Sequence, residues 1–293
     1  MHFGHVLTAL VTPFDAKGNV NFPTLTELIE RLIHHGTEGF VITGTTGESP
    51  VLSIEEMESI YKHVVSVVNK RVPVIAGTGT NNTKKTIQLT KIAEAQNVDG
   101  IMLVSPYYNR PNQQGLYEHF RTVANETTLP IMLYNIPGRC GVLIEAETII
   151  ELSKINNIIA VKEASGNLEL ATTVVANTPD DFYLYSGDDS MTLPMMAIGA
   201  TGVVSVASHI IGLEMNEMVH SFLEGKTVEA ASIHRNMLPI MKGLFMAPSP
   251  APVKAAVRMQ GIDVGSVRLP LVDLTEVEKV RLKKIMQEHM NIS

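Results

Sequence analysis

Short hydrophobic runs recur along the whole chain, and turns rich in glycine, proline or hydroxyl side chains follow most of them. The runs are nearly continuous rather than alternating, which is typical of parallel strands that are covered on both faces. The pattern therefore predicts parallel strands in eight segments: VLTALVTPF from Val6, GFVITGT from Gly39, VPVIAGTG from Val72, GIMLVSP from Gly100, LPIMLYNIP from Leu129, IIAVKEAS from Ile158, FYLYSGDD from Phe182 and GVVSVASH from Gly202.

Segments with helical periodicity lie between these runs. FPTLTELIERLIHHG carries its apolar residues on one helical face and ends at Gly36. SIEEMESIYKHVVSVVNK opens with Ser53 and Glu56, which have the spacing of a capping box. NTKKTIQLTKIAEAQN and GLYEHFRTVANET repeat the amphipathic pattern. Strands that alternate with helices in this way predict a (β/α)8 TIM barrel, a fold of about 250 residues.

A doubly wound open sheet is the alternative fold for the same alternation. Such a sheet usually carries a glycine-rich phosphate-binding turn after its first strand, whereas the turn here is TPFDAKG. Beyond Leu223 the sequence indicates helices, TEVEKVRLKKIMQEHM among them. We therefore expect a catalytic barrel over residues 1–223 and a C-terminal helical extension over residues 224–293.

Composition and charge narrow the classes of function. The chain has 293 residues, of which 45% are hydrophobic, enough for one large core. A net charge of −7 with scattered signs argues against nucleic acid or an acidic membrane surface as a partner. Cys140 is the single cysteine, which indicates a reducing compartment. The start, MHFGHVLTALVTPFD, lacks the features of a signal peptide, and no apolar run approaches membrane-spanning length, so we expect a cytoplasmic protein.

The chemistry of a parallel barrel is placed at the C-terminal ends of its strands. In this chain those ends read TGTTGES, GTGTNN, SPYYNRP, YNIPGR, KEAS, SGDD and SVASH. Glycines, hydroxyls and tyrosines concentrate there, acidic residues and histidines are sparse, and no two histidines have ligand spacing. We therefore expect neither a metal ion nor a cofactor.

Lys162 is unusual because it ends a run that otherwise has the pattern of a buried strand, and an ammonium group is costly to bury. If Lys162 faces the barrel interior, strand alternation places Ala160 and Ala164 on the same face and Glu163 toward the helices. Desolvation would lower the pKa of the amine and make it a nucleophile toward a carbonyl carbon. The structural alternative is a lysine that reaches out to solvent or pairs with an acid.

Neighbouring strand ends add groups that suit this chemistry. Tyr134 lies one strand from Lys162 and can relay protons, or it is simply an interior tyrosine with a satisfied hydroxyl. Thr45 and Thr46, flanked by glycines, offer hydroxyl and N–H groups for a small carboxylate, or they form a plain turn. Arg139 can bind a second carboxylate in bidentate fashion, or it is an exposed arginine without a role.

Several spaced motifs together resemble the dihydrodipicolinate synthase family. They are GTTGES at residues 44–49, YYNRP at 107–111, YNIPGR at 134–139, KEASGN at 162–167 and GVVSV at 202–206. The resemblance covers essentially the whole chain, including MAPSPAPVKAA and VGSVRLPL near the C-terminus. It implies a (β/α)8 barrel with a C-terminal helical segment, in agreement with the pattern of elements.

The resemblance also implies a reaction and a role for individual residues. Lys162 would form an imine with pyruvate, and the derived enamine would attack L-aspartate 4-semialdehyde on the route to diaminopimelate and lysine. Tyr134 would donate and accept protons, and Thr45 and Tyr108 would complete the relay. The resemblance places Tyr108 in the site of a neighbouring subunit, within a homodimer or homotetramer.

Further residues are implied as contacts to the two substrates. Thr46 and Val204 would bind pyruvate, and Arg139 would bind the carboxylate of the semialdehyde. Gly187 would be a further substrate-binding residue. Relatives often have threonine at the position of Cys140, and we expect little effect because the arginine itself is present.

Two other functions remain open at this point. N-acetylneuraminate lyase and similar aldolases share the imine lysine and the tyrosine, but those relatives typically lack the arginine of PGR. A non-catalytic barrel that senses a small acid is the alternative from another class, since fold alone does not fix function.

Feedback by lysine is a further property of some members of this family. The resemblance places the lysine site near Ser49, Asn81 and Tyr107, which this chain keeps. Ile54 and Met57 are apolar where polar groups are expected, and Lys85 stands where an acid is expected. An ammonium in place of a carboxylate repels the lysine side chain, so we expect an enzyme that lysine does not inhibit.

Overall fold

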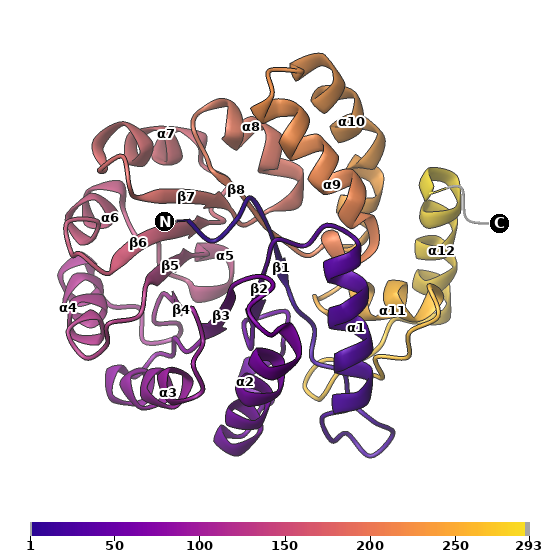
Figure 1. The fold of residues 1–293 in the computed structure, drawn as a ribbon, viewed down its shortest axis with the longest axis horizontal. Helices are drawn as coiled ribbons and strands as arrows, with labels where there is room; N and C mark the ends of the chain where they lie inside the picture. The colour runs from indigo at the N-terminus through magenta and orange to yellow at the C-terminus, as the bar shows by residue number, and fades with distance from the viewer. Residues whose placement is uncertain (1, 291–293) are drawn as a thin grey trace.

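The eight predicted strands form a closed parallel barrel in the computed structural model, which describes residues 2–290 (Figure 1). Each strand pairs with its neighbour in chain order, and β8 closes the barrel on β1. The predicted (β/α)8 fold is therefore confirmed. The strands are β1 Val6–Ala9, β2 Gly39–Ile42, β3 Val74–Gly77, β4 Gly100–Val104, β5 Ile131–Asn135, β6 Ile158–Glu163, β7 Tyr183–Ser186 and β8 Gly202–Ser205.

The strands are shorter than the hydrophobic runs that predicted them. The run from Val6 has nine residues, but β1 has four, because the residues that follow it are buried in a loop. Leu10 and Val11 are both buried there, although neither belongs to the strand. Hydrophobicity reports burial rather than strand pairing, so the loops at the carboxyl ends extend the apparent strands.

Helices surround the barrel and connect its strands (Figure 1). The predicted capping box opens α2, since the Ser53 side chain accepts from the Glu56 backbone and the Glu56 side chain from the Ser53 backbone. The helices are α1 Phe22–His34, α2 Ile54–Val68, α3 Thr83–Ala95, α4 Gln113–Ala124, α5 Pro137–Cys140, α6 Ala146–Leu152, α7 Leu168–Asn177, α8 Thr192–Ala197 and α9 Ser208–Leu223, with short 3₁₀ turns η1 Ser49–Val51 and η2 Asp189–Met191.

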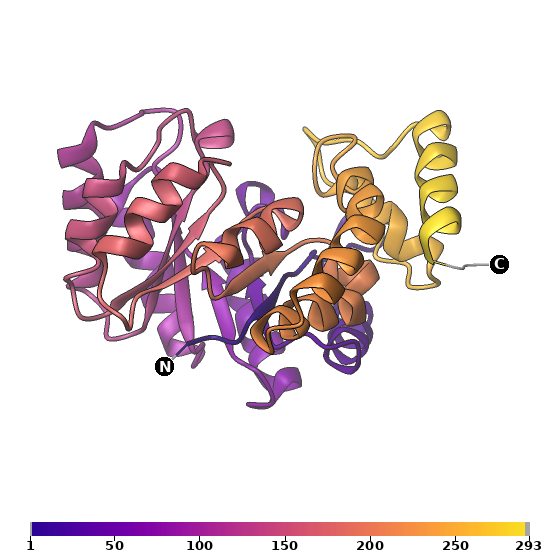
Figure 2. The same cartoon turned by 90° about the horizontal axis from the view of Figure 1, so that it is seen from above.

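The C-terminal part of the chain is helical, as predicted. It consists of α10 Thr227–Gly243, α11 Ala251–Met259 and α12 Glu276–Met290. Figure 2 shows α10 beside α9 and α12 at the edge of the molecule farthest from α6 and α7. The extension shares one hydrophobic core with the barrel, because Leu282 of α12 and Val253 of α11 belong to the same buried cluster as the strands. A domain boundary between residues 223 and 224 stays a prediction.

None of the helices between residues 2 and 290 is both long enough and apolar enough to cross a membrane.

Candidate active site

Lys162 lies near the carboxyl end of β6 with its side chain only 5% exposed. It is in register with Tyr134 of β5, and its Nζ lies 4.2 Å from the centroid of the Tyr134 ring. Burial is the largest influence and lowers the pKa of Lys162 to about 8; the charge of Asp189 raises the pKa, and that of Arg139 lowers it. At neutral pH roughly a tenth of this amine is uncharged, compared with well under about one part in a thousand for an exposed lysine.

Tyr134 is a proton-carrying group beside this amine. Burial raises the pKa of Tyr134 to about 12, while the charge of Arg139 and a hydrogen bond with Thr45 lower it. The phenol therefore stays protonated at neutral pH and can donate a proton. Strand alternation predicted that Lys162 and Tyr134 lie side by side, and the structure adds the contact of Tyr134 with Thr45 from the turn after β2.

The next residue on each of these two strands points away from the interior. Asn135 Nδ2 donates to Glu163 Oε2 over 2.8 Å and to the Ile144 carbonyl oxygen over 3.0 Å. The Ser165 N–H donates to Glu163 Oε1, and burial raises the pKa of Glu163. The carboxylate next to Lys162 in sequence is therefore held on the opposite face of β6.

Gly187 follows β7 and lies against the lysine. Its N–H donates to the Glu163 carbonyl oxygen over 2.7 Å. A Cβ atom at position 187 would lie 2.7 Å from Ala164 Cβ and 3.1 Å from Lys162 Cε. A side chain at this position would crowd Ala164 and the Lys162 side chain, so the glycine leaves space beside Lys162.

Asp189 is a buried carboxylate beside the site that the sequence did not single out. Its Oδ2 accepts from the backbone N–H groups of Val206 and Ala207 at 3.1 and 3.0 Å, and its Oδ1 accepts from Ser205 Oγ. Burial raises the pKa of Asp189, while these hydrogen bonds lower it. The signal was present in SGDD, one of the few acidic strand ends, but the pattern does not tell which aspartate turns inward.

Thr46 and Val204, the two residues expected to contact pyruvate, are both buried. Thr46 is buried in the loop that joins β2 to η1. Across the sheet, Lys162 of β6 is in register with Tyr185 of β7, and Tyr185 is in register with Gly202 of β8. Val204 is buried on β8, two residues after Gly202. Because alternate strand residues share a face, Val204 faces the same interior as Lys162.

Arg139 lies exposed on α5, at the mouth of the site. With Thr45 and Cys140 it lines a cavity of about 330 Å³, and a smaller cavity that Thr45 also lines reaches Tyr134. Burial raises the pKa of Cys140 to about 11, so this thiol stays protonated. The larger cavity also includes residues that the family resemblance connects with lysine binding: Ser49, Ile54, Met57, Lys85 and Tyr107.

Tyr108 is exposed, whereas Tyr134 is buried and Thr45 is half-buried. Its side chain is 90% exposed, so it does not pack inside the barrel with Lys162 and Tyr134. Its backbone is left-handed, with φ of 72°, which is unfavourable for a residue with a large side chain. That Tyr108 lies apart from Lys162 and Tyr134 of its own chain was predicted from the family resemblance and not from the residue pattern.

In residues 2–290, no group of three or more histidine, cysteine, aspartate or glutamate residues is placed to hold a metal ion.

A closed parallel barrel with a desolvated lysine beside a buried tyrosine at its carboxyl end defines a class, the imine-forming barrel enzymes. The model of the dihydrodipicolinate synthetase family matches residues 2–289. The chain belongs to this family, and the resemblance predicted from its motifs is confirmed.

Individual relatives are similar over nearly their full length. The 4-hydroxy-tetrahydrodipicolinate synthase of Bacillus subtilis is 56% identical over 98% of this chain and 100% of its own. The crystal structure of dihydrodipicolinate synthase DapA-2 from Bacillus anthracis is 54% identical, with a TM-score of 0.96 and 98% of each chain covered. The enzyme from Cyanidioschyzon merolae, solved with lysine bound, is 44% identical, with a TM-score of 0.95 and 97% of each chain covered.

Proposed function

We propose that this chain is a Schiff-base-forming lyase with the activity of 4-hydroxy-tetrahydrodipicolinate synthase, the name that its relatives carry. The observation that carries the proposal is the buried amine of Lys162 beside the protonated phenol of Tyr134. An amine with a pKa near 8 is a competent nucleophile near neutral pH, and the phenol is an acid at the same place.

The reaction begins when the Lys162 amine attacks the ketone carbon of pyruvate. The carbinolamine loses water to give an imine, with Tyr134 donating the proton that the departing oxygen needs. Loss of a proton from the methyl carbon gives an enamine, which attacks the aldehyde carbon of L-aspartate 4-semialdehyde. The amino group of that substrate then attacks the imine carbon, which closes the ring and releases Lys162 as a free amine.

Each residue expected to bind a substrate is assigned by its chemistry and its place around Lys162. Thr46 lies in a glycine-flanked turn whose N–H and hydroxyl groups suit the pyruvate carboxylate. Val204 and Gly187 bound the space in which pyruvate stands next to Lys162. Arg139, at the mouth, suits the carboxylate of the longer second substrate, because a guanidinium binds a carboxylate in bidentate fashion.

The proposal includes a second copy of the chain. Tyr108 completes the proton relay with Thr45 and Tyr134 only if it enters the site of a neighbouring subunit. Its 90% exposure supports this arrangement, since a large aromatic ring gains by being covered. We expect a homodimer or homotetramer located in the cytoplasm.

Trapping with borohydride tests the function directly. Reduction in the presence of pyruvate should add one three-carbon unit to the protein, and peptide mapping should locate it on Lys162. Lys162→Ala should abolish both the adduct and turnover in a coupled assay with pyruvate and aspartate semialdehyde. An adduct on another lysine would overturn the mechanism, and faster turnover with sugar-acid aldehydes would indicate an N-acetylneuraminate lyase-like aldolase instead.

A further inference from the structure

The turn that carries Thr45 and Thr46 is anchored by a residue buried beneath it. Glu48 is only 2% exposed, although it lies in a loop and carries a carboxylate. Its backbone is left-handed, with φ of 58°, and its N–H donates to the Thr45 carbonyl oxygen over 3.1 Å. A non-glycine residue persists in this conformation only where its surroundings hold it there.

The partner of Glu48 comes from the C-terminal extension. Lys254 of α11 is fully buried, and its Nζ lies 2.6 Å from Glu48 Oε1. The same Nζ donates to the Ser266 carbonyl oxygen over 2.9 Å and lies 4.2 Å from the centroid of the Phe14 ring. Burial lowers the pKa of Lys254 and the charge of Glu48 raises it.

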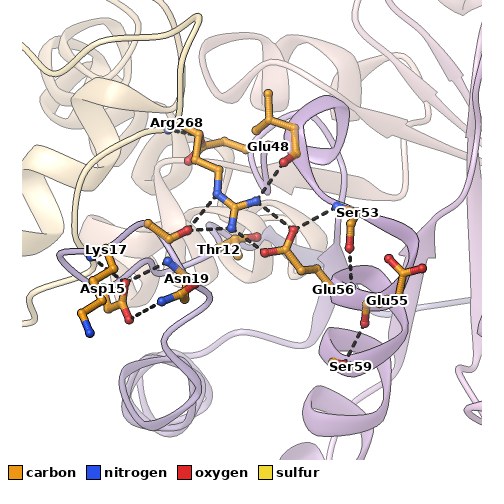
Figure 3. Close-up of polar contacts among 12 residues, drawn as sticks. Thr12, Asp15, Lys17, Asn19, Glu48, Ser53, Glu55, Glu56, Ser59 and Arg268 are labelled. Carbon is orange, nitrogen blue, oxygen red and sulfur yellow. Dashed lines mark hydrogen bonds and ion pairs between the residues drawn. The ribbon is translucent and has the colours of Figure 1, made fainter.

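Arg268 of the same extension holds the second carboxylate oxygen. Its backbone N–H donates to Glu48 Oε2 over 2.8 Å. Its guanidinium donates to the Val51 carbonyl oxygen over 2.8 Å, to the carbonyl oxygen of Gly18, and to Glu56 at the start of α2 (Figure 3). Both ends of the segment from Glu48 to Glu56 are therefore tied to a part of the chain more than two hundred residues away in sequence.

Stability alone does not account for a fully buried ion pair here. Well-packed apolar residues of similar volume often give equal or greater stability than a buried pair, because removing two charges from water is costly. A carboxylate whose two oxygens are bound from two directions has a fixed orientation, and apolar side chains do not provide that.

We propose that Glu48 and Lys254 are positioning residues for the reaction, through which the C-terminal extension sets the placement of the Thr45–Thr46 turn relative to Tyr134 and Lys162. This inference rests on the proposed function. It assigns the extension a part in binding pyruvate and relaying protons. Arg139 is carried by α5, in a different loop from Glu48, so we expect the contact to the second substrate to depend less on this anchor.

Lys254→Met tests the proposal, because methionine keeps most of the volume and removes the charge. The KM for pyruvate should rise and kcat should fall, so that kcat/KM drops about 100-fold, the order expected when a catalytic group is misplaced by about an ångström. The KM for the semialdehyde should stay unchanged. Loss of folded protein would lower kcat alone and leave both KM values as they are.

The double variant Glu48→Met/Lys254→Met distinguishes an effect on the placement of the turn from an effect on protein stability. It also tests the proposal if the single variant Lys254→Met does not fold. This pair removes both charges and should be thermally more stable than Lys254→Met, because no unpaired charge is left buried, while its KM for pyruvate stays raised. Wild-type kinetics in the double variant would overturn the proposal, as would unchanged kinetics in Lys254→Met.

Arg258→Met is the matched control within the extension. It removes an ion pair with Asp273, 3.4 Å long, and a bond to the Gly265 carbonyl oxygen. Its KM for pyruvate should equal that of the wild type, and a rise as large as that of Lys254→Met would contradict the proposal. Borohydride trapping of pyruvate by the wild type distinguishes failure of the proposed function from failure of this inference. The absence of an adduct on Lys162 would contradict the proposed function. An adduct on Lys162 together with wild-type kinetics in the Lys254→Met variant would contradict only the positioning role.

Discussion

The buried lysine should make the protein less stable than a version without it. A pKa lowered from 10.5 to about 8 means that the folded state disfavours the ammonium. One unit of pKa is worth about 1.4 kcal/mol, so the shift corresponds to about 3 kcal/mol. The ammonium lies 4.2 Å from the Tyr134 ring centroid, a contact that offsets about 1 kcal/mol. Lys162→Met should therefore raise the free energy of unfolding by about 2 kcal/mol at pH 7 while abolishing activity.

The pH dependence follows from the direction of the shift. Below pH 8 both the folded and the unfolded chain carry the proton, so the destabilisation is fully present. Between pH 8 and 10.5 the folded state releases the proton while the unfolded state keeps it, so the wild type gains stability as the pH rises. The advantage of Lys162→Met should consequently shrink over this interval.

Urea denaturation of both proteins at pH 7 and pH 9.5, without pyruvate and at one protein concentration, measures the difference. Lys154→Met is the control, because Lys154 is exposed and pairs only with Glu151 on the surface. Its stability should match that of the wild type at both pH values. A Lys162→Met protein that is less stable at pH 7, or a gain that does not change with pH, would refute the reasoning.

Three further predictions concern catalysis and control. Arg139→Ala should raise the KM for the semialdehyde and lower turnover by about 1.5–3 kcal/mol of transition-state stabilisation, while borohydride trapping of pyruvate survives; loss of trapping would show that Arg139 has another role. Tyr108→Phe should impair turnover, and mixing it with Lys162→Ala should restore some activity; no rescue after confirmed subunit exchange would indicate self-contained sites. Lysine at sub-millimolar concentration should not inhibit the coupled assay, because Lys85 repels the ammonium group of its side chain. For charges about 4 Å apart the repulsion is about 1 kcal/mol in water and about 4 kcal/mol at a protein surface. Inhibition by sub-millimolar lysine would contradict this prediction.

The barrel and the chemistry of its interior could be predicted because both depend on patterns that repeat over a few residues of the sequence. Alternation with a period of two placed Lys162 inward and Glu163 outward, and the chain order of the strands made Tyr134 a neighbour of Lys162. These relations involve residues on the same strand or on consecutive strands. They follow once the strands are recognised.

Contacts between distant segments could not be predicted in this way. Glu48 and Arg268 are 220 positions apart, and no periodicity connects a loop after β2 with the end of the chain. Asp189 was missed for a related reason, since its burial depends on the β8–α9 turn that binds it. The strand ends were overestimated because residues that directly follow a strand, such as Leu10 and Val11, are as buried as the strand itself.

The outward pair of Asn135 and Glu163 has a consequence for how the protein tolerates insertions and deletions. A shift of β6 by one residue against β5 would turn Glu163 inward and move Lys162 among the helices. An acid would then stand where the amine is required, so the error would reverse the charge of the site rather than weaken it. The shift would also break the 2.8 Å bond between Asn135 and Glu163 and leave a buried carboxylate without its partner. The outward bond between Asn135 and Glu163 therefore fixes the register that points Lys162 inward. We expect a chain with the shifted register to fail to fold, so that it would not present the wrong group to a substrate.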